Sequence, residues 1–346
     1  MGSRGTDQNP TNRFENVDRV MVEEGDDTAI PSPRTQLIPD RTRTILSQNN
    51  SPDVGFEVSL NPYRGCEHGC IYCYARPTHE YLGYSAGLDF ETKILVKERA
   101  PELLRQTLAA PGWTPKVVSI SGVTDPYQPV ERKLGLTRRC LEVFAEFRNP
   151  LFIVTKNALV TRDLDYLTVL AEHDAAAVFV SVTTLDYDLA GVMEPRTSRP
   201  GRRLEAIKTL AQCGIPVGVF MAPVIPGLTD HEIPAVLEKA REAGARFAGY
   251  VPIRLPYGLK ELFENWLETH FPARKEKVLS RIREVRGGRL NDSSFSTRMR
   301  GEGVMADSLR ALFQVTKKRL GFEKLPELSC SAFQRLPQPG EQLPLL

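Results

Sequence analysis

Short apolar runs recur along the middle of the chain, between residues 54 and 255. Five are rich in β-branched residues and a weaker sixth precedes them: residues 116–120 (KVVSI), 151–155 (LFIVT), 177–183 (AVFVSVT), 216–222 (PVGVFMA) and 247–253 (FAGYVPI), and residues 55–60 (GFEVSL). Apolar runs of this length, bounded by polar segments, predict buried β-strands.

Helical patterns separate these predicted strands. Residues three and four positions apart share one face in three groups: Leu103, Leu104, Thr107 and Leu108; Leu164, Leu167 and Leu170; Leu204, Ile207 and Leu210. Strands that alternate with helices predict parallel βα units. A partly closed barrel and an open sheet both satisfy this pattern, so periodicity leaves the choice open.

The two ends of the chain differ from its middle. Residues 1–50 have few apolar clusters and carry six Arg and eight Asp or Glu, which is typical of an extension that is partly disordered or draped over the core. Helical patterns return at residues 258–286 and 304–320, and the last 24 residues contain four Pro. We therefore expect an extension (1–53), a core (54–257), a helical region (258–322) and a flexible tail (323–346).

Composition places the chain among globular proteins, with 41% apolar and 25% charged residues. No apolar run approaches the roughly 20 residues that span a bilayer. The first residues, MGSRGTDQNPTNRFEN, lack the apolar segment of a secretory signal. We expect a cytoplasmic protein that has no membrane partner and keeps its cysteines reduced.

The net charge of +2 hides a basic C-terminal region. Residues 271–335 carry fifteen Lys or Arg and seven Asp or Glu, a net of +8. A nucleic-acid partner accounts for such an excess, and a solvated helical surface accounts for it equally well.

Three cysteines lie within eight residues in the stretch NPYRGCEHGCIYCYA: Cys66, Cys70 and Cys73. Thiolates are the usual ligands of iron–sulfur clusters. A cubane cluster bound by three cysteines keeps one iron open for another ligand, as a catalytic zinc keeps an open position. Gly65 and Gly69 allow the backbone conformations that wrapping around a cluster requires.

Spacing alone leaves two further roles open for these cysteines. A zinc site would use the three thiolates with His68 or His79 as the fourth ligand, or the thiols are ordinary buried side chains. The remaining cysteines of the chain, Cys140, Cys213 and Cys330, are expected to be packing or surface thiols.

The spacing Cys-x3-Cys-x2-Cys, with the aromatic Tyr72 before the last cysteine, resembles the signature of the radical S-adenosylmethionine (SAM) superfamily. The stretches NPYRGCEHGCIYCYARPTHEYLGYSAGLDFETKILVK and TDPYQPVE are similar to the branch of spore photoproduct lyase and its bacterial relatives of unknown substrate. The resemblance covers about residues 54–255. It implies an α/β fold, a partial (β/α)6 TIM-type barrel with a helical C-terminal extension.

The resemblance also implies cofactors and chemistry. A 4Fe-4S cluster on Cys66, Cys70 and Cys73 would cleave SAM reductively, and the resulting 5′-deoxyadenosyl radical would abstract hydrogen from a substrate. An electron donor such as flavodoxin or ferredoxin would supply the electron.

Polar residues follow several predicted strands, where parallel barrels place their chemistry. The resemblance implies that Lys156 and Ser181 hold the carboxylate of SAM. It places a further set around the ribose, sulfonium and adenine: Tyr72, Thr124, Asp125, Thr183, Glu194, Arg199 and Ile225. A purely structural role is the alternative for each, such as a turn at Asp125 or an ion-pair cluster of Glu194 with Arg199 and Arg203.

The substrate is less defined. Spore photoproduct lyase repairs a thymine dimer in DNA and uses a cysteine just after the second strand as a hydrogen donor. This chain reads SISGVTD there and has no cysteine. Tyr127 or Tyr84 is the alternative donor, and repair of DNA is one candidate reaction.

The chain ends in QLPLL, from Gln342 to Leu346. This pentapeptide resembles the short motif by which bacterial replication and repair proteins bind the sliding clamp, and a frayed tail is the alternative. Two functional hypotheses follow: a radical SAM enzyme whose substrate is nucleic acid or another macromolecule, and a zinc- or cluster-containing binding module without SAM chemistry.

Overall fold

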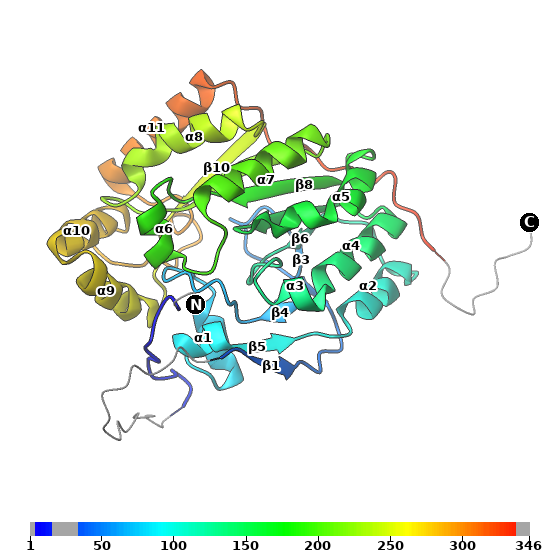
Figure 1. The fold of residues 1–346 in the computed structure, drawn as a ribbon, viewed down its shortest axis with the longest axis horizontal. Helices are drawn as coiled ribbons and strands as arrows, with labels where there is room; N and C mark the ends of the chain where they lie inside the picture. The colour runs from blue at the N-terminus through cyan, green and yellow to red at the C-terminus, as the bar shows by residue number, and fades with distance from the viewer. Residues whose placement is uncertain (1–3, 16–33, 337–346) are drawn as a thin grey trace, which may run out of the picture.

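The computed structural model describes residues 4–15 and 34–336 (Figure 1). Its centre is a seven-stranded sheet in the order β10-β9-β8-β7-β6-β3-β2. The strands are β2 (Leu46–Gln48), β3 (Val58–Leu60), β6 (Val118–Ile120), β7 (Leu151–Thr155), β8 (Ala176–Ser181), β9 (Val217–Val224) and β10 (Phe247–Pro252). All are parallel except β2, which is antiparallel to β3. Every strand predicted between residues 54 and 255 is confirmed, and so is the α/β class.

The outer face of this sheet is covered by five helices (Figure 1): α2 (Ala100–Ala109), α4 (Leu136–Phe147), α5 (Leu164–Ala171), α7 (Pro200–Gln212) and α8 (Ile233–Glu242). The apolar positions that predicted α2, α5 and α7 are buried in one core with the strands, including Leu104, Leu167 and Ile207. Burying each such side chain stabilises the fold by about 1.5–3 kcal/mol.

The sheet curves around a cavity of about 840 Å³. Alternate residues of a strand point to one face, so Phe152 and Val154 of β7 and Phe179 and Ser181 of β8 all line this cavity. The two edge strands of the sheet also contribute residues to the cavity lining, among them Ser47 of β2 and Val251 of β10. The sheet is therefore a partial barrel with the cavity inside it.

A second, three-stranded sheet was not predicted from the sequence. It consists of β1 (Gln36–Pro39), β5 (Lys93–Val96) and β4 (Tyr63–Arg64) in the order β1-β5-β4. Its strands gave no clear pattern because β1 is largely exposed and β4 has two residues. Residues 4–15 lie beside this region, with the Leu88 N–H donating to Gln8 O at 2.8 Å, so the described parts of residues 1–53 lie over the core.

Shorter helices connect these elements: η1 (Arg76–Leu82), α1 (Leu88–Thr92), α3 (Glu131–Leu134), η2 (Ala158–Asp163), α6 (Tyr187–Met193), η3 (Asp230–Glu232) and η4 (Pro272–Arg274). The C-terminal region is helical, as expected, with α9 (Leu259–His270), α10 (Lys275–Val285) and α11 (Gly303–Arg319). None of the helices in the described ranges is long and apolar enough to cross a membrane.

Residues 323–336 pack against the barrel, although they belong to the segment 323–346 that was expected to be a flexible tail. The Ser329 N–H donates to Asp174 O, and the Gln334 N–H donates to Phe147 O, both at 2.9 Å. These carbonyls lie just before β8 and β7, so the segment runs along the N-terminal ends of the strands, and Leu325 lines the cavity from there. The QLPLL motif lies outside the described residues.

Candidate active site

The cysteine loop lies between β4 and η1 and faces the cavity. Cys66 and Cys70 are buried, Cys73 is partly buried, and all three line the cavity. Gly65 and Gly69 have φ angles of +80° and +70°, so the left-handed conformations expected at these positions are present. Burial raises the pKa of all three thiols.

Hydrogen bonds from outside the loop hold its backbone. Buried Arg76 donates from Nε to Cys70 O at 3.0 Å. Gln128 accepts from the Glu67 N–H at 2.9 Å and donates to Gly65 O at 3.1 Å. These backbone polar groups are thus satisfied by the protein, and the sulfur atoms are presented to the cavity.

The two histidines considered as zinc ligands are engaged elsewhere. His68 Nδ1 lies 3.4 Å from Asp125 Oδ2, and its Nε2 lies 3.1 Å from Asn157 Nδ2. His79 Nε2 is 3.0 Å from Lys93 O. Among the described residues, no group of three or more Cys, His, Asp or Glu side chains converges on one metal ion. A cubane does not require such convergence, because each thiolate binds a different iron.

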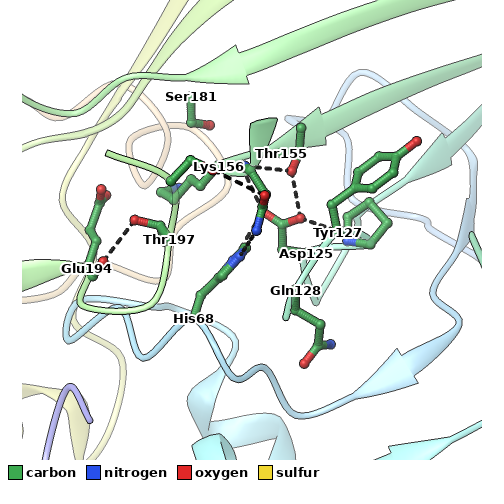
Figure 2. Close-up of polar contacts among 12 residues, drawn as sticks. His68, Asp125, Tyr127, Gln128, Thr155, Lys156, Ser181, Glu194 and Thr197 are labelled. Carbon is green, nitrogen blue, oxygen red and sulfur yellow. Dashed lines mark hydrogen bonds and ion pairs between the residues drawn. The ribbon is translucent and has the colours of Figure 1, made fainter. Parts of the chain in front are cut away.

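Asp125, which follows β6, connects the C-terminal ends of the neighbouring strands β6 and β7 (Figure 2). Its carboxylate accepts from Thr155 Oγ1 at 2.7 Å, from the Lys156 N–H at 2.7 Å and from the Tyr127 N–H at 2.9 Å. Burial opposes ionisation, but His68 and these hydrogen bonds outweigh it and lower the pKa of Asp125. The carboxylate therefore positions Lys156, whose side chain lines the cavity.

Two buried hydroxyls of residues that line the cavity have no hydrogen-bond partner among the described residues. The hydroxyls of Ser119, on β6, and Ser181, at the end of β8, are buried and make no hydrogen bond in the described structure. A buried hydroxyl without a partner costs about 1–3 kcal/mol. The Lys156 side chain lines the same cavity. Its ammonium donates to Ala222 O at 3.1 Å and lies 5.7 Å from the centre of the Tyr72 ring. This wall suits a polar, anionic ligand group.

Glu194 lies behind Tyr72 and is 2% exposed. Its carboxylate accepts from Thr183 Oγ1 at 2.6 Å, from the Tyr72 hydroxyl and from the Arg203 guanidinium. Burial raises the pKa of Glu194, although Arg203 opposes the shift. The cluster fixes the orientation of Tyr72, whose ring lines the cavity.

Comparison with known proteins decides the family. The family model for the Radical SAM superfamily matches residues 60–240, which include the cysteine loop and the strand ends above. The chain belongs to the Radical SAM superfamily. Membership implies a 4Fe-4S cluster and SAM as cofactors, and it supports an enzyme.

Individual relatives agree with this assignment. An uncharacterised protein of Mycobacterium tuberculosis is 34% identical over 68% of this chain and 69% of its own length. Spore photoproduct lyase of Bacillus subtilis is 27% identical over 53% of this chain and 49% of its own length. The structure of spore photoproduct lyase complexed with a dinucleoside spore photoproduct superposes with a TM-score of 0.55 at 16% identity, covering 83% of this chain and 80% of that one. The structural likeness shows a shared fold.

The residues present fit both radical SAM cofactors. Three thiols line one part of the cavity, as a cluster with an open iron requires, and the unpaired Ser181 hydroxyl lies on the same cavity wall. Thr124 also lines this cavity, although its hydroxyl donates to Tyr63 O at 3.1 Å.

Four residues expected near SAM, Glu194 among them, are not among the described residues that line the cavity. Thr183 contacts Glu194. Ile225 is fully buried in a hydrophobic cluster that also contains Tyr72. Arg199 donates to Tyr187 O at 2.8 Å, at the start of α7. The structure therefore places Ile225 and Thr183 beside residues of the site and Arg199 away from it.

The two tyrosines considered as hydrogen donors are not among the described residues that line the cavity. Tyr127 is buried and donates to Asp163 Oδ2 at 3.1 Å, and Tyr84 packs against His79 with ring centroids 5.4 Å apart. Tyr74 does line it, half exposed, and donates to Gly122 O at 2.9 Å. Its position directly after Cys73 is the one sequence signal that could have indicated it.

Proposed function

We propose that Cys66, Cys70 and Cys73 hold the 4Fe-4S cluster of a radical SAM enzyme that abstracts hydrogen from a substrate bound in the barrel. The observation that carries this proposal is the placement of three thiols and the unpaired Ser181 hydroxyl on one cavity. When bound, the cofactors supply a one-electron cleavage of the SAM sulfonium that yields a 5′-deoxyadenosyl radical.

In this proposal the chain's own residues bind and orient SAM. The Lys156 ammonium pairs with its carboxylate as a point charge, and the Ser181 hydroxyl donates a hydrogen bond to the same group. Asp125 holds the Lys156 backbone in place, with Thr124 beside it for the ribose. Glu194 and Thr183 act through Tyr72, which packs with Ile225 on the adenine side.

The barrel interior would exclude water from the radical. Its lining is mostly apolar, with Phe152, Phe179 and Phe220 facing the cavity, and such walls prevent quenching by solvent. Among the three tyrosines, Tyr74 is the best-placed hydrogen donor because it lines the cavity. Burial raises the pKa of Tyr74 to about 12, so its hydroxyl keeps its proton at neutral pH. Tyr127 and Tyr84 would need a rearrangement to reach the cavity.

The partners in this proposal are an electron donor such as flavodoxin or ferredoxin, and nucleic acid as the first substrate class to test. Spore photoproduct lyase among the relatives and the net charge of +8 over residues 271–335 support nucleic acid. Clamp binding through the motif from Gln342 to Leu346 is a separate proposal, tested by peptide binding to a sliding clamp.

The test is SAM cleavage by the anaerobically purified, cluster-reconstituted protein with dithionite as reductant. We expect 5′-deoxyadenosine from the native protein and none from Cys70→Ala. Cys213→Ala is the matched control, because Cys213 is exposed at the end of α7 and is not among the described residues that line the cavity. This control should cleave SAM normally. Stoichiometric zinc, no sulfide and no cleavage would instead support the binding module.

A further inference from the structure

The cavity contains an arginine whose charge is not matched by a carboxylate. Arg254 follows β10 and lines the cavity beside Tyr74, with its guanidinium carbon 5.7 Å from the Tyr74 ring. Nη1 lies 3.4 Å from Met299 Sδ, a weak acceptor. Nε is buried and has no hydrogen-bond partner. Within the described ranges, no ion pair includes Arg254.

The two neighbouring arginines both donate hydrogen bonds to oxygen atoms. Arg298 forms a two-pronged ion pair with Asp53, with both N–O distances 2.6 Å. Arg286 is 2% exposed and donates only to backbone carbonyls, including Ile253 O at 2.7 Å and Arg298 O at 2.7 Å. Arg254 therefore differs from both neighbours in donating to no oxygen atom of the described residues.

Arg286 also holds the two cavity arginines in place. Its guanidinium donates to the carbonyl of the residue before Arg254 and to the carbonyl of Arg298 itself. Two segments that are far apart in sequence are thereby fixed at one rim of the cavity. These bonds fix the backbone beside Arg254, and so they set the point from which its side chain extends along the cavity.

The charge at this rim does not balance. Arg254 and Arg298 contribute two positive charges and Asp53 one negative charge, which leaves one positive charge among these cavity-lining residues. Burial, reinforced by Arg298, lowers the pKa of Arg254, and the carboxylates of Asp53 and Asp292 oppose the shift without outweighing it. A buried charge of this kind is stabilised by pairing with an opposite charge.

We propose that Arg254 binds a singly charged oxyanion of the substrate, a phosphodiester or a carboxylate, while an apolar or aromatic part of the substrate enters the barrel. This inference rests on the proposed function for the identity of the site. The planar guanidinium suits the oxygens of either group, and Tyr74 and Phe220 line the adjoining wall. Lys156, directly after β7, and Ser181, at the end of β8, are then available to bind the SAM carboxylate.

The test measures binding of two matched monoanions, benzoate and methyl phenyl phosphate, and of uncharged methyl benzoate. Dissociation constants are determined by NMR titration for the protein as purified and again with cluster and SAM. We expect one or both anions to bind the native protein and Arg254→Gln to weaken that binding at least about tenfold, the loss of a hydrogen bond to a charged group. The anion that binds more tightly shows whether the substrate oxyanion is a phosphodiester or a carboxylate.

Three controls make the test decisive. Arg254→Lys keeps the charge and should weaken anion binding less than Arg254→Gln. Arg246→Gln removes an exposed arginine paired with Glu323 and should leave anion binding unchanged. The affinity for methyl benzoate should be the same in every variant.

Equal anion binding by Arg254→Gln and native protein overturns the proposal. A matching loss of SAM affinity also overturns it, because that result would assign Arg254 to the cofactor. Failure of SAM cleavage with Arg254-dependent anion binding intact would overturn the proposed function alone.

Discussion

Arg76 and Glu91 form a fully buried ion pair directly beneath the cysteine loop, with Nη2 2.5 Å from Oε1 and both side chains 0% exposed. The same guanidinium donates to Cys70 O at 3.0 Å and to Gly87 O at 2.9 Å. Glu91 in turn accepts from the Gly5 N–H at 2.9 Å. This pair connects the N-terminal segment, the cysteine loop and the segment before β5.

Replacing Arg76 by Met should destabilise the protein strongly. The change leaves Glu91 buried without its counter-charge, which costs about 3–5 kcal/mol. Urea denaturation measures the free energy of unfolding. The matched control is Arg281→Met, which breaks the exposed pair with Glu284 and should cost less than about 1 kcal/mol. Similar losses in the two variants would contradict the structural importance of the buried pair.

Replacing Ser181 by Ala should separate stability from SAM binding. Without SAM, the variant should be as stable as the native protein or slightly more stable, because an unpaired buried hydroxyl is removed. SAM should bind about tenfold to a hundredfold more weakly, because a hydrogen bond to a charged group is worth about 1.5–3 kcal/mol. Equilibrium dialysis measures the dissociation constant. An unchanged SAM affinity would remove Ser181 from the site.

Replacing Glu194 by Gln should act mainly through Arg203 and Tyr72. Arg203 is 1% exposed and loses the negative charge that it contacts, so we expect a loss of about 3–5 kcal/mol in the free energy of unfolding. Denaturation and SAM titration are compared on the same sample. A stable variant that has lost SAM affinity would instead show that Glu194 contacts SAM directly.

The stability of the fold should fall in acid because of His79. Burial lowers the pKa of His79 from 6.5 to about 4, so the folded protein binds fewer protons than the unfolded chain between these values. The contribution of neutral His79 is therefore complete above pH 6.5 and is lost as the pH falls toward 4, by about 3 kcal/mol in total.

His79→Gln tests this dependence, since Gln retains a donor for Lys93 O and does not titrate. We expect urea midpoints of native protein to fall more steeply than those of the variant between pH 7 and 4.5. Parallel curves would show that His79 does not carry the effect.

Much of the fold and part of the site could be predicted from the sequence. Five of the seven barrel strands were predictable because each is a buried run rich in β-branched residues, and the cysteine loop because its spacing is local. β3 gave a weaker pattern, and β2, three residues long and mostly exposed, was not predicted. The small sheet was missed because pairing, rather than composition, makes β1, β4 and β5 strands. Lys156 and Ser181 were singled out by their positions at strand ends, and both line the cavity.

Residues whose environment depends on distant contacts could not be assigned in this way. The pairing of Glu194 with Arg203 was one of the alternatives considered from the sequence, and it is present. The contact of Glu194 with Tyr72, 122 positions away in the sequence, has no local signal. Arg254 looks like any surface arginine in the sequence. Its place at the cavity rim depends on Arg286 from the C-terminal helical region, which fixes the backbone beside it.

The most direct test of the central claim is electron paramagnetic resonance of the reconstituted, dithionite-reduced protein with and without SAM. The account predicts a reduced 4Fe-4S signal that changes when SAM is added, is absent in Cys66→Ala, Cys70→Ala and Cys73→Ala, and is retained in Cys213→Ala. A protein that assembles no cluster, or a cluster whose signal is unaffected by SAM, would contradict the assignment of this cavity.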